Sequence, residues 1–437
     1  MVHRNPSDFP VAAIVAPAVQ PIVLPDHDTL GIVALAEKYL TPNYRNAPLV
    51  FVGGDGPWAV TVEGKRYLDF SAGVAVNALG HNHPDFVAAL HGQVGRLLHQ
   101  SNYWHNAHAA PLAQALCERY SEAARAITGV AWPARCFFAN SGAEGTEAAV
   151  KLARRYHAKI VGRPRPDFVT MHGSFHGRTY AAMSATAQPK YQEGFEPLVP
   201  GFRHAEFGNL ASLEAQLDDR VGAVLIEVVQ GEGGVKFAPS GYFRALRKLC
   251  DDRGMLLLFD EVQTGLGRTG SFYAFEQEGV VPDALWLAKA LGGGVPIGAL
   301  VARDAVAQAL VPGSHATTFG ANALATFAGR TVLAIFERDG IVQRSADVGA
   351  YLLERLHAAF DGQPYTTDVR GRGLMVGVEV RGDPKKVVDA ARARGLLLST
   401  AGTHVLRLTP PLIVDRNHCD LAVQRLRQAA DEVFAPA

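Results

Sequence analysis

The sequence predicts an α/β protein with a large, mostly parallel-sheet domain and a smaller α+β domain. Apolar runs of strand length alternate with amphipathic segments of helix length through the central region. The connections between these runs are long enough for the crossovers that parallel pairing needs. A chain of 437 residues with 48% hydrophobic residues can also fill cores of that size.

One helix and strand pair of the large domain shows how the elements are recognised. Residues 242–253 place Phe243, Leu246 and Leu249 on one helical face, Gly254 stops the helix, and an apolar strand follows at 255–259. The same reasoning predicts a set of strands for this domain at residues 136–139, 168–171, 223–229, 255–259, 284–288 and 299–302.

The pattern changes after about residue 320. A long helix is predicted over 321–360, and a second helix begins at Asp383 and Pro384, an N-cap residue followed by a favoured first helical residue. The remaining elements of this part are strands at 374–380, 396–399 and 405–408 and a final helix at 418–433. The predicted division of the chain is an arm (1–30), the first part of the small domain (31–69), the large domain (70–330) and the rest of the small domain (331–437).

Composition narrows the partners and the compartment. The 42 basic and 42 acidic residues balance, so charge gives no argument for nucleic acid or for an acidic membrane. The four cysteines lie far apart without a C-x-x-C pair, which favours neither a disulfide framework nor a zinc or other metal site and fits a reducing cytoplasm. The apolar run at 11–24 contains two prolines and is too short to span a bilayer, so it is predicted to be an extended arm.

The string GLGRTG at residues 265–270 matches the glycine pattern of a dinucleotide-binding turn. That turn needs its first glycine directly after a strand and an acid about 20 residues later. Here the strand at 256–259 is followed by Asp260 and Glu261 before Gly265, and the next apolar run ends in Lys289. The spacing therefore argues against a nicotinamide or flavin oxidoreductase, which is kept as a remote alternative.

Four strand ends carry residues suited to one cofactor. The small-residue turn at 140–143 opens a helix whose free N–H groups could seat a phosphate, although a simple Ser-Gly cap looks the same. Asp260 closes an apolar strand, Lys289 follows another, and Phe175 follows a third. Each alone has an ordinary reading, as a loop cap, a surface lysine or a packed aromatic. Together they are what pyridoxal 5'-phosphate needs: a phosphate seat, an acid for the ring nitrogen, an amine and a flat ring.

The same residues carry a family resemblance. FDEVQTGLGRTG and AKALGGGVPIGA, with Lys289 placed 29 positions after Asp260, resemble the class III pyridoxal-phosphate aminotransferases of the ornithine, acetylornithine and 4-aminobutyrate group. So do NSGAEGTEAAVKLAR, SFHGRT, VVQGEGGV, SHATTFGANALA and VLRLTPPL, in order from about residue 43 to 426. The resemblance implies fold type I, as in aspartate aminotransferase, and a homodimer with shared active sites.

The resemblance also implies a role for each matched residue of the cofactor site. By that match the residues are Ser141, Gly142 and Ala143 at the phosphate, Phe175 on the ring face, Asp260 at the ring nitrogen, Gln263 at the ring hydroxyl, Lys289 as the Schiff-base lysine and Thr318 at the neighbouring subunit's phosphate. Lys289 and Asp260 would be the catalytic pair. Ala316 and Ala321, in the same segment as Thr318, stand where the family usually has glycines. These two differences leave the predicted role of Thr318 unchanged.

Substrate choice depends on receptors for carboxylates. Arg178 resembles the arginine for the distal carboxylate, and Arg407 resembles the one for the α-carboxylate of glutamate or 2-oxoglutarate. Glu232 resembles the acid that masks the second arginine while an ω-amino donor is bound. This pair favours amino transfer over an aminomutase or racemase, which would need no receptor for 2-oxoglutarate. A ping-pong cycle follows, in which the donor's terminal amine passes to the cofactor and then to 2-oxoglutarate.

Two positions bear on the donor. Tyr44 matches a tyrosine that helps to hold the donor's carboxylate in ornithine-type members, and Val74 stands where ornithine 5-aminotransferases carry a tyrosine. The segment FSAGVAVNALGHNHP most resembles the acetylornithine-type members of the family, which favours N-acetylornithine as the amino donor. Ornithine, succinylornithine and 4-aminobutyrate are the alternatives.

Overall fold

The computed structural model describes residues 28–435, in two compact units. The run at 11–24, predicted to be an extended arm, lies outside the described residues. The smaller unit comprises 28–52 and 61–65, and the larger comprises 53–60 and 66–435. Among the residues described, no helix is both long and apolar enough to cross a membrane.

The smaller unit contains helix α1 (Thr29–Tyr39). Its N-cap is Asp28, whose carboxylate accepts a hydrogen bond from the N–H of Gly31 at 2.7 Å. None of the residues of α1 is buried. Tyr44 follows the helix and is 77% exposed within this unit.

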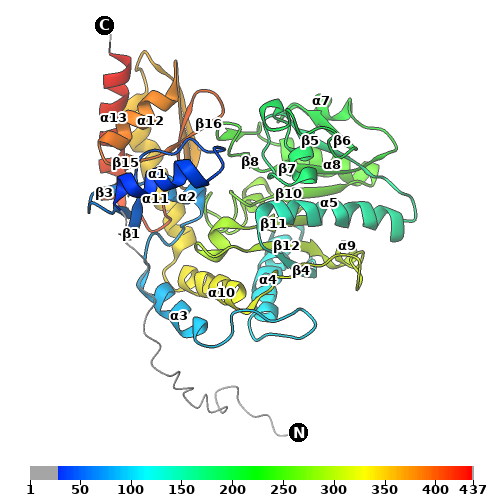
Figure 1. The fold of residues 1–437 in the computed structure, drawn as a ribbon. Helices are drawn as coiled ribbons and strands as arrows, with labels where there is room; N and C mark the ends of the chain where they lie inside the picture. Colours follow the sequence, from blue (N-terminus) through cyan, green and yellow to red (C-terminus); the bar gives the residue numbers. More distant parts are fainter. Residues whose placement is uncertain (1–27, 436–437) are drawn as a thin grey trace. The chain divides into compact units, whose positions relative to one another are not determined.

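The larger unit is built on a seven-stranded sheet (Figure 1), with strand order β4-β12-β11-β10-β7-β5-β6. Its strands are β4 (Ala134–Ala139), β5 (Asp167–Met171), β6 (Phe202–Ala205), β7 (Val221–Glu227), β10 (Leu256–Asp260), β11 (Ala284–Leu287) and β12 (Gly298–Arg303). All six strands predicted for this domain are present, and the edge strand β6 was not predicted. The α/β class with a mostly parallel sheet is confirmed.

Strand β12 corrects one expectation, since it pairs antiparallel with both β11 and β4. The sequence analysis expected the run at 299–302 to pair in parallel like the others. Only residues 288–297 connect β11 to β12, and they hold a short 3₁₀ turn, η4 (Lys289–Gly292), rather than a crossover helix. A connection of that length can only turn the chain back.

Alternating side chains of the sheet build two cores, one on each face. Leu258, Trp286 and Leu300 belong to the core that includes helix α5 (Gly142–Lys159). Their neighbours along the strands, such as Leu257 and Leu285, belong to the core that includes α4 (Ala109–Thr128) and α8 (Tyr242–Arg253). The sheet is therefore buried on both faces, which explains why its strands are almost continuously apolar.

The C-terminal part of the larger unit holds a four-stranded antiparallel sheet, in the order β13-β14-β17-β16. Its strands are β13 (Thr366–Arg372), β14 (Met375–Val380), β16 (Ser399–Ala401) and β17 (Val405–Leu408). The strand expected at 396–399 is divided, because β15 (Leu396–Leu397) pairs with β3 (Arg66–Asp69) and only β16 joins this sheet. The helix starting at Asp383 is confirmed as α12 (Pro384–Ala393), and the final helix is α13 (Arg416–Phe434).

The long helix expected at 321–360 is two helices, α10 (Ala323–Arg338) and α11 (Ile341–Phe360). Gly340 stands between them with φ 60°, a left-handed conformation that ends a helix. The remaining elements are β1 (Phe51–Asp55), β2 (Trp58–Thr61), α2 (Ala72–Ala75), α3 (Pro84–Val94), α6 (Tyr180–Ala185), η2 (Pro189–Tyr191), α7 (Leu210–Glu214), β8 (Val229–Gln230), β9 (Lys236–Phe237), η3 (Ala274–Glu278) and α9 (Asp304–Ala307). The division of the chain at residues 30, 69 and 330 stays a prediction.

Candidate active site

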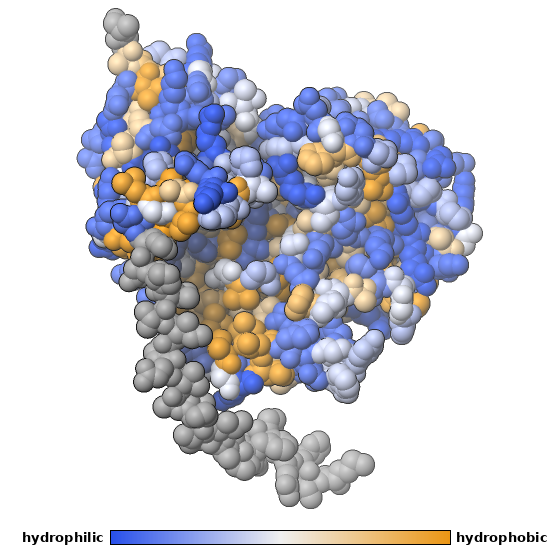
Figure 2. All heavy atoms as spheres, viewed as in Figure 1, coloured by the Kyte–Doolittle hydropathy of each residue, from blue (hydrophilic) through white to orange (hydrophobic). Residues whose placement is uncertain are grey.

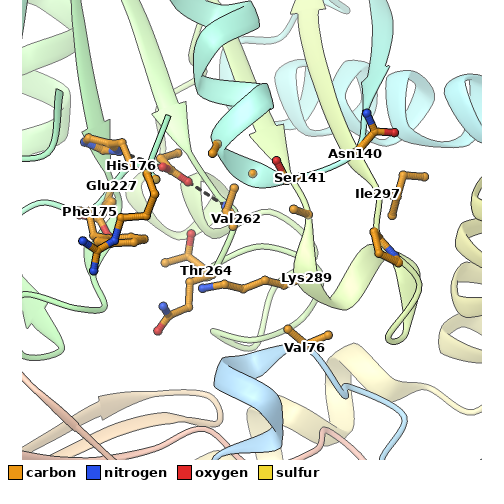
Figure 3. A pocket seen from close by; sticks show the side chains of 18 of the residues that line it. Val76, Asn140, Ser141, Phe175, His176, Glu227, Val262, Thr264, Lys289 and Ile297 are labelled. Atoms are coloured by element: carbon orange, nitrogen blue, oxygen red, sulfur yellow. Dashed lines mark hydrogen bonds and ion pairs between the residues drawn. The ribbon is translucent and has the colours of Figure 1, made fainter. Parts of the chain in front are cut away.

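A cavity of about 440 Å³ opens at the carboxyl ends of the parallel strands (Figure 3). This is the edge at which open α/β sheets bind ligands. Eight of the residues singled out from the sequence line it, namely Ser141, Gly142, Ala143, Phe175, Arg178, Asp260, Gln263 and Lys289. Segments separated by more than a hundred residues of sequence therefore meet in one cavity. This agrees with the prediction that residues at the ends of four strands form one site.

The upper wall of the cavity in Figure 3 is the start of helix α5. Ser141 is the N-cap, and its hydroxyl accepts a hydrogen bond from the N–H of Glu144 at 3.2 Å. The N–H groups of Gly142 and Ala143 have no acceptor inside the helix. A Cβ atom at Gly142 would lie 2.8 Å from the methyl groups of Val262, so only glycine fits. This helix start can bind an anion such as a phosphate.

A buried acidic group forms the far side of the cavity. Asp260 ends β10 and is 5% exposed, and one of its oxygens accepts from the N–H of Val262 at 3.0 Å. Its other oxygen lies 2.8 Å from Nδ1 of His176, which is also buried. The imidazole therefore fixes the carboxylate in one orientation, leaving it able to hold a protonated ring nitrogen.

Glu227 stands beside Asp260 on the neighbouring strand β7, at the paired position of the register. Burial, and then the charge of Asp260, raise the pKa of Glu227 well above its usual range. One oxygen of Glu227 accepts from the N–H of Phe175 at 3.2 Å, so this acid also holds the backbone that presents the Phe175 ring to the cavity.

Lys289 reaches across the centre of the cavity from the turn after β11 (Figure 3). Its φ is 45°, a left-handed conformation that costs a non-glycine residue about 1–3 kcal/mol and is found mainly at functional sites. Burial of its amine lowers the pKa of Lys289 to about 8. A substantial fraction of this amine is therefore neutral near pH 7–8 and able to attack a carbonyl group.

An ion pair between Arg407 and Glu232 is connected to the wall of the cavity through Gln263. Arg407, on β17, is 2% exposed and forms an ion pair with Glu232. The same guanidinium donates to Oε1 of Gln263 at 3.3 Å and to Oγ of Ser399 at 3.1 Å. Burial acts to raise the pKa of Glu232, but the charge and hydrogen bond of Arg407 outweigh it and lower the pKa. Glu232 is therefore charged at neutral pH and occupies the arginine.

Four predicted residues do not line this cavity: Glu232, Arg407, Thr318 and Tyr44. Thr318 is exposed, on the segment between α9 and α10. Tyr44 belongs to the smaller unit.

His176 and Glu227 line the site but were not predicted from the sequence. His176 lies inside the quoted SFHGRT motif, and Glu227 ends an apolar strand as Asp260 does, so the strand-end argument could have found both.

The glycines of GLGRTG shape a buried loop rather than a nucleotide turn. Gly267 and Gly270 have φ of 83° and 90°, which a residue with a side chain rarely adopts. The loop brings Arg268 into the interior, where its guanidinium donates to the carbonyl oxygens of Leu374 at 2.9 Å and Pro410 at 2.6 Å. This loop therefore links the end of β10 to the C-terminal part of the chain.

Comparison with known proteins agrees with this geometry. The family model for aminotransferase class-III matches residues 39–430. An acetylornithine aminotransferase of Aquifex aeolicus is 44% identical over 391 residues, which cover 89% of this chain and 99% of that protein. One of Methanocaldococcus jannaschii is 42% identical, covering 92% and 97%. The crystal structure of the ornithine aminotransferase from Toxoplasma gondii ME49 superposes with a TM-score of 0.87 at 31% identity, covering 93% and 96%. The chain belongs to the class III family of aminotransferases, enzymes that depend on pyridoxal 5'-phosphate.

Proposed function

We propose that this aminotransferase transfers the terminal amine of N-acetylornithine to 2-oxoglutarate, giving N-acetylglutamate 5-semialdehyde and glutamate. The observation that carries the proposal is the ion pair between the buried Arg407 and the partly exposed Glu232, beside Lys289. It supplies a second carboxylate receptor that is closed at rest, as an enzyme with two unlike substrates needs. The relatives named acetylornithine aminotransferase, 44% and 42% identical, support the choice of donor.

The cavity fits the cofactor of the family. The start of α5 at Ser141, Gly142 and Ala143 would hold its phosphate, and the Val262 methyl groups leave no room there for a larger residue than glycine. Asp260 would face the ring nitrogen and Phe175 the ring. When bound, the cofactor supplies an electron sink for the carbon that loses its proton.

The remaining chemistry belongs to side chains of this chain. The neutral amine of Lys289 would bond to the cofactor's aldehyde carbon. Once the donor's amine has displaced it there, the freed amine would move the proton at the substrate carbon. Asp260, oriented by His176, would keep the ring nitrogen protonated. Gln263 would contact the ring hydroxyl and, through its bond to Arg407, connects the cofactor to the second receptor.

Substrate exchange would depend on two arginines. Arg178 would bind the carboxylate of N-acetylornithine while Glu232 keeps Arg407 occupied, and the role of Tyr44 stays a prediction. When 2-oxoglutarate enters, Glu232 would move away and Arg407 would bind its α-carboxylate by two parallel hydrogen bonds. One cavity would thus accept an ω-amine and an α-keto acid in turn.

A homodimer is part of the proposal. Apolar side chains are exposed around the end of α3 and the segment after it, and Figure 2 shows apolar surface near α3 and α10. Leu98 and Trp104 are 49% and 63% exposed, and Phe319 is 61% exposed next to Thr318. The side chain of Asn102 donates to the carbonyl oxygen of Gly320 at 2.9 Å, so both segments form one surface. A second copy covering it would receive Thr318 at its phosphate site.

The donor is tested by following loss of the cofactor's absorbance after mixing with single donors. N-acetylornithine, ornithine, succinylornithine, 4-aminobutyrate and glutamate would be compared at equal concentration. We expect N-acetylornithine to react fastest and 2-oxoglutarate to restore the band. Faster reaction of 4-aminobutyrate or ornithine would contradict N-acetylornithine as the preferred donor, but it would not affect the assignment to the class III family.

A further inference from the structure

Arg178 lies against the face of a second aromatic ring that the sequence analysis did not single out. The guanidinium carbon of Arg178 is 3.9 Å from the ring centroid of Tyr191 and 5.6 Å from that of Phe175. The two rings meet edge to face, with centroids 5.8 Å apart at an interplanar angle of 82°. Tyr191 therefore touches both the arginine and the ring beside the cofactor site.

In the described part of the chain, no carboxylate holds Arg178 in place. Among residues 28–435 it forms no ion pair, and its side chain is exposed at the wall of the cavity. An unpaired arginine can accept a substrate carboxylate, but its long side chain has many rotamers, and ordering them on binding costs free energy. A ring face that already holds the guanidinium reduces this cost.

Tyr191 is itself anchored. It ends the short helix η2, and its neighbours tie that helix to the segment carrying Phe175 and Arg178. The Gln188 side chain donates to the carbonyl oxygen of Ser174 at 2.8 Å. The Gln192 side chain donates to that of Thr186 at 2.9 Å. These bonds hold the backbone on either side of Tyr191 in place.

We propose that Tyr191 is a positioning residue that holds the Arg178 guanidinium ready for the carboxylate of the amino donor. It sets affinity for donors with a carboxylate remote from the reacting amine, while the chemical step is left to Lys289. The inference rests on the proposed role of Arg178 as the donor's carboxylate receptor.

The test measures binding of N-acetylnorvaline, which has the donor's carboxylate but lacks its reacting amine. Dissociation constants would be obtained by calorimetry on the cofactor-loaded protein for Tyr191→Leu, Tyr191→Phe, Arg178→Gln and the double variant. A cation–π contact at an exposed site is worth about 0.5–1 kcal/mol, so Tyr191→Leu should weaken binding about two- to fivefold. Tyr191→Phe keeps the ring face and should bind as the parent does.

The double variant separates positioning from general damage. If Tyr191 acts through Arg178, Tyr191→Leu should change nothing further once Arg178→Gln is present. An equal loss in both backgrounds, or an equal loss for Tyr191→Phe, would overturn the inference. Unchanged binding in Arg178→Gln alone would instead contradict the proposed function of Arg178, and the inference with it. Tyr191→Met serves in place of Tyr191→Leu if the latter does not fold, and it carries the same expectation.

Discussion

Replacing Glu232 by glutamine should make glutamate a better substrate relative to N-acetylornithine. Glu232 forms an ion pair with Arg407, which is 2% exposed, so the α-carboxylate of glutamate would have to compete with Glu232 for this arginine. A hydrogen bond to a charged group contributes about 1.5–3 kcal/mol, and the glutamine side chain competes for the arginine without its charge. The rate ratio of glutamate to N-acetylornithine should therefore rise by about tenfold to a hundredfold.

The assay is the rate at which each amino donor bleaches the cofactor band in single-turnover mixing. Glu214→Gln, at an exposed position on α7, is a matched control and should leave the ratio unchanged. Glu232→Gln should also lower the free energy of unfolding, because Arg407 stays buried and charged with only neutral partners, Ser399 and Gln263. An unchanged donor ratio in a folded Glu232→Gln protein would refute the proposal that Glu232 masks Arg407.

Four further results are expected. Because burial lowers the pKa of Lys289 to about 8, cofactor addition to the apo-protein should accelerate as pH rises through about 8, seen as growth of the band near about 400 nm. The folded pKa lies below the unfolded 10.5, so this lysine's contribution makes the apo-protein more stable as pH rises from about 8 to 10.5, measurable by denaturant unfolding. A rate that rises only above pH 10 would contradict the first of these. Asp260→Asn should lower kcat by about a hundredfold or more while the protein still folds, and near-parental kcat would exclude its role at the ring nitrogen. Gly142→Ala should weaken cofactor binding, because the added Cβ would lie 2.8 Å from the Val262 methyl carbons. Equilibrium dialysis measures the affinity for the cofactor, and an unchanged affinity would exclude the helix start as the phosphate site.

The candidate site was largely predictable because parallel strands bring their carboxyl ends together. Asp260, Phe175 and Lys289 each follow an apolar run, and pairing of those runs is enough to place them around one cavity. Periodicity could not reveal the antiparallel direction of β12, which depends on the short connection at 288–297. Nor could it divide the helix expected at 321–360, where a single glycine, Gly340, ends one helix before the next.

Contacts between side chains are harder to read from sequence than strand ends. The bond between His176 and Asp260 joins residues 84 positions apart, and the stacking of Arg178 on Tyr191 depends on a turn that carries no apolar pattern. Thr318 is exposed in the single chain, and its proposed contact is with the phosphate site of a second copy of the chain.

Borohydride reduction of the cofactor-loaded protein, followed by peptide mass spectrometry, tests whether Lys289 is the lysine that binds the cofactor. The account predicts one modified peptide, with the reduced cofactor on Lys289, and no trapped cofactor in Lys289→Ala. Cofactor trapped on another lysine, or an active Lys289→Ala protein, would contradict the assignment of this cavity as the active site.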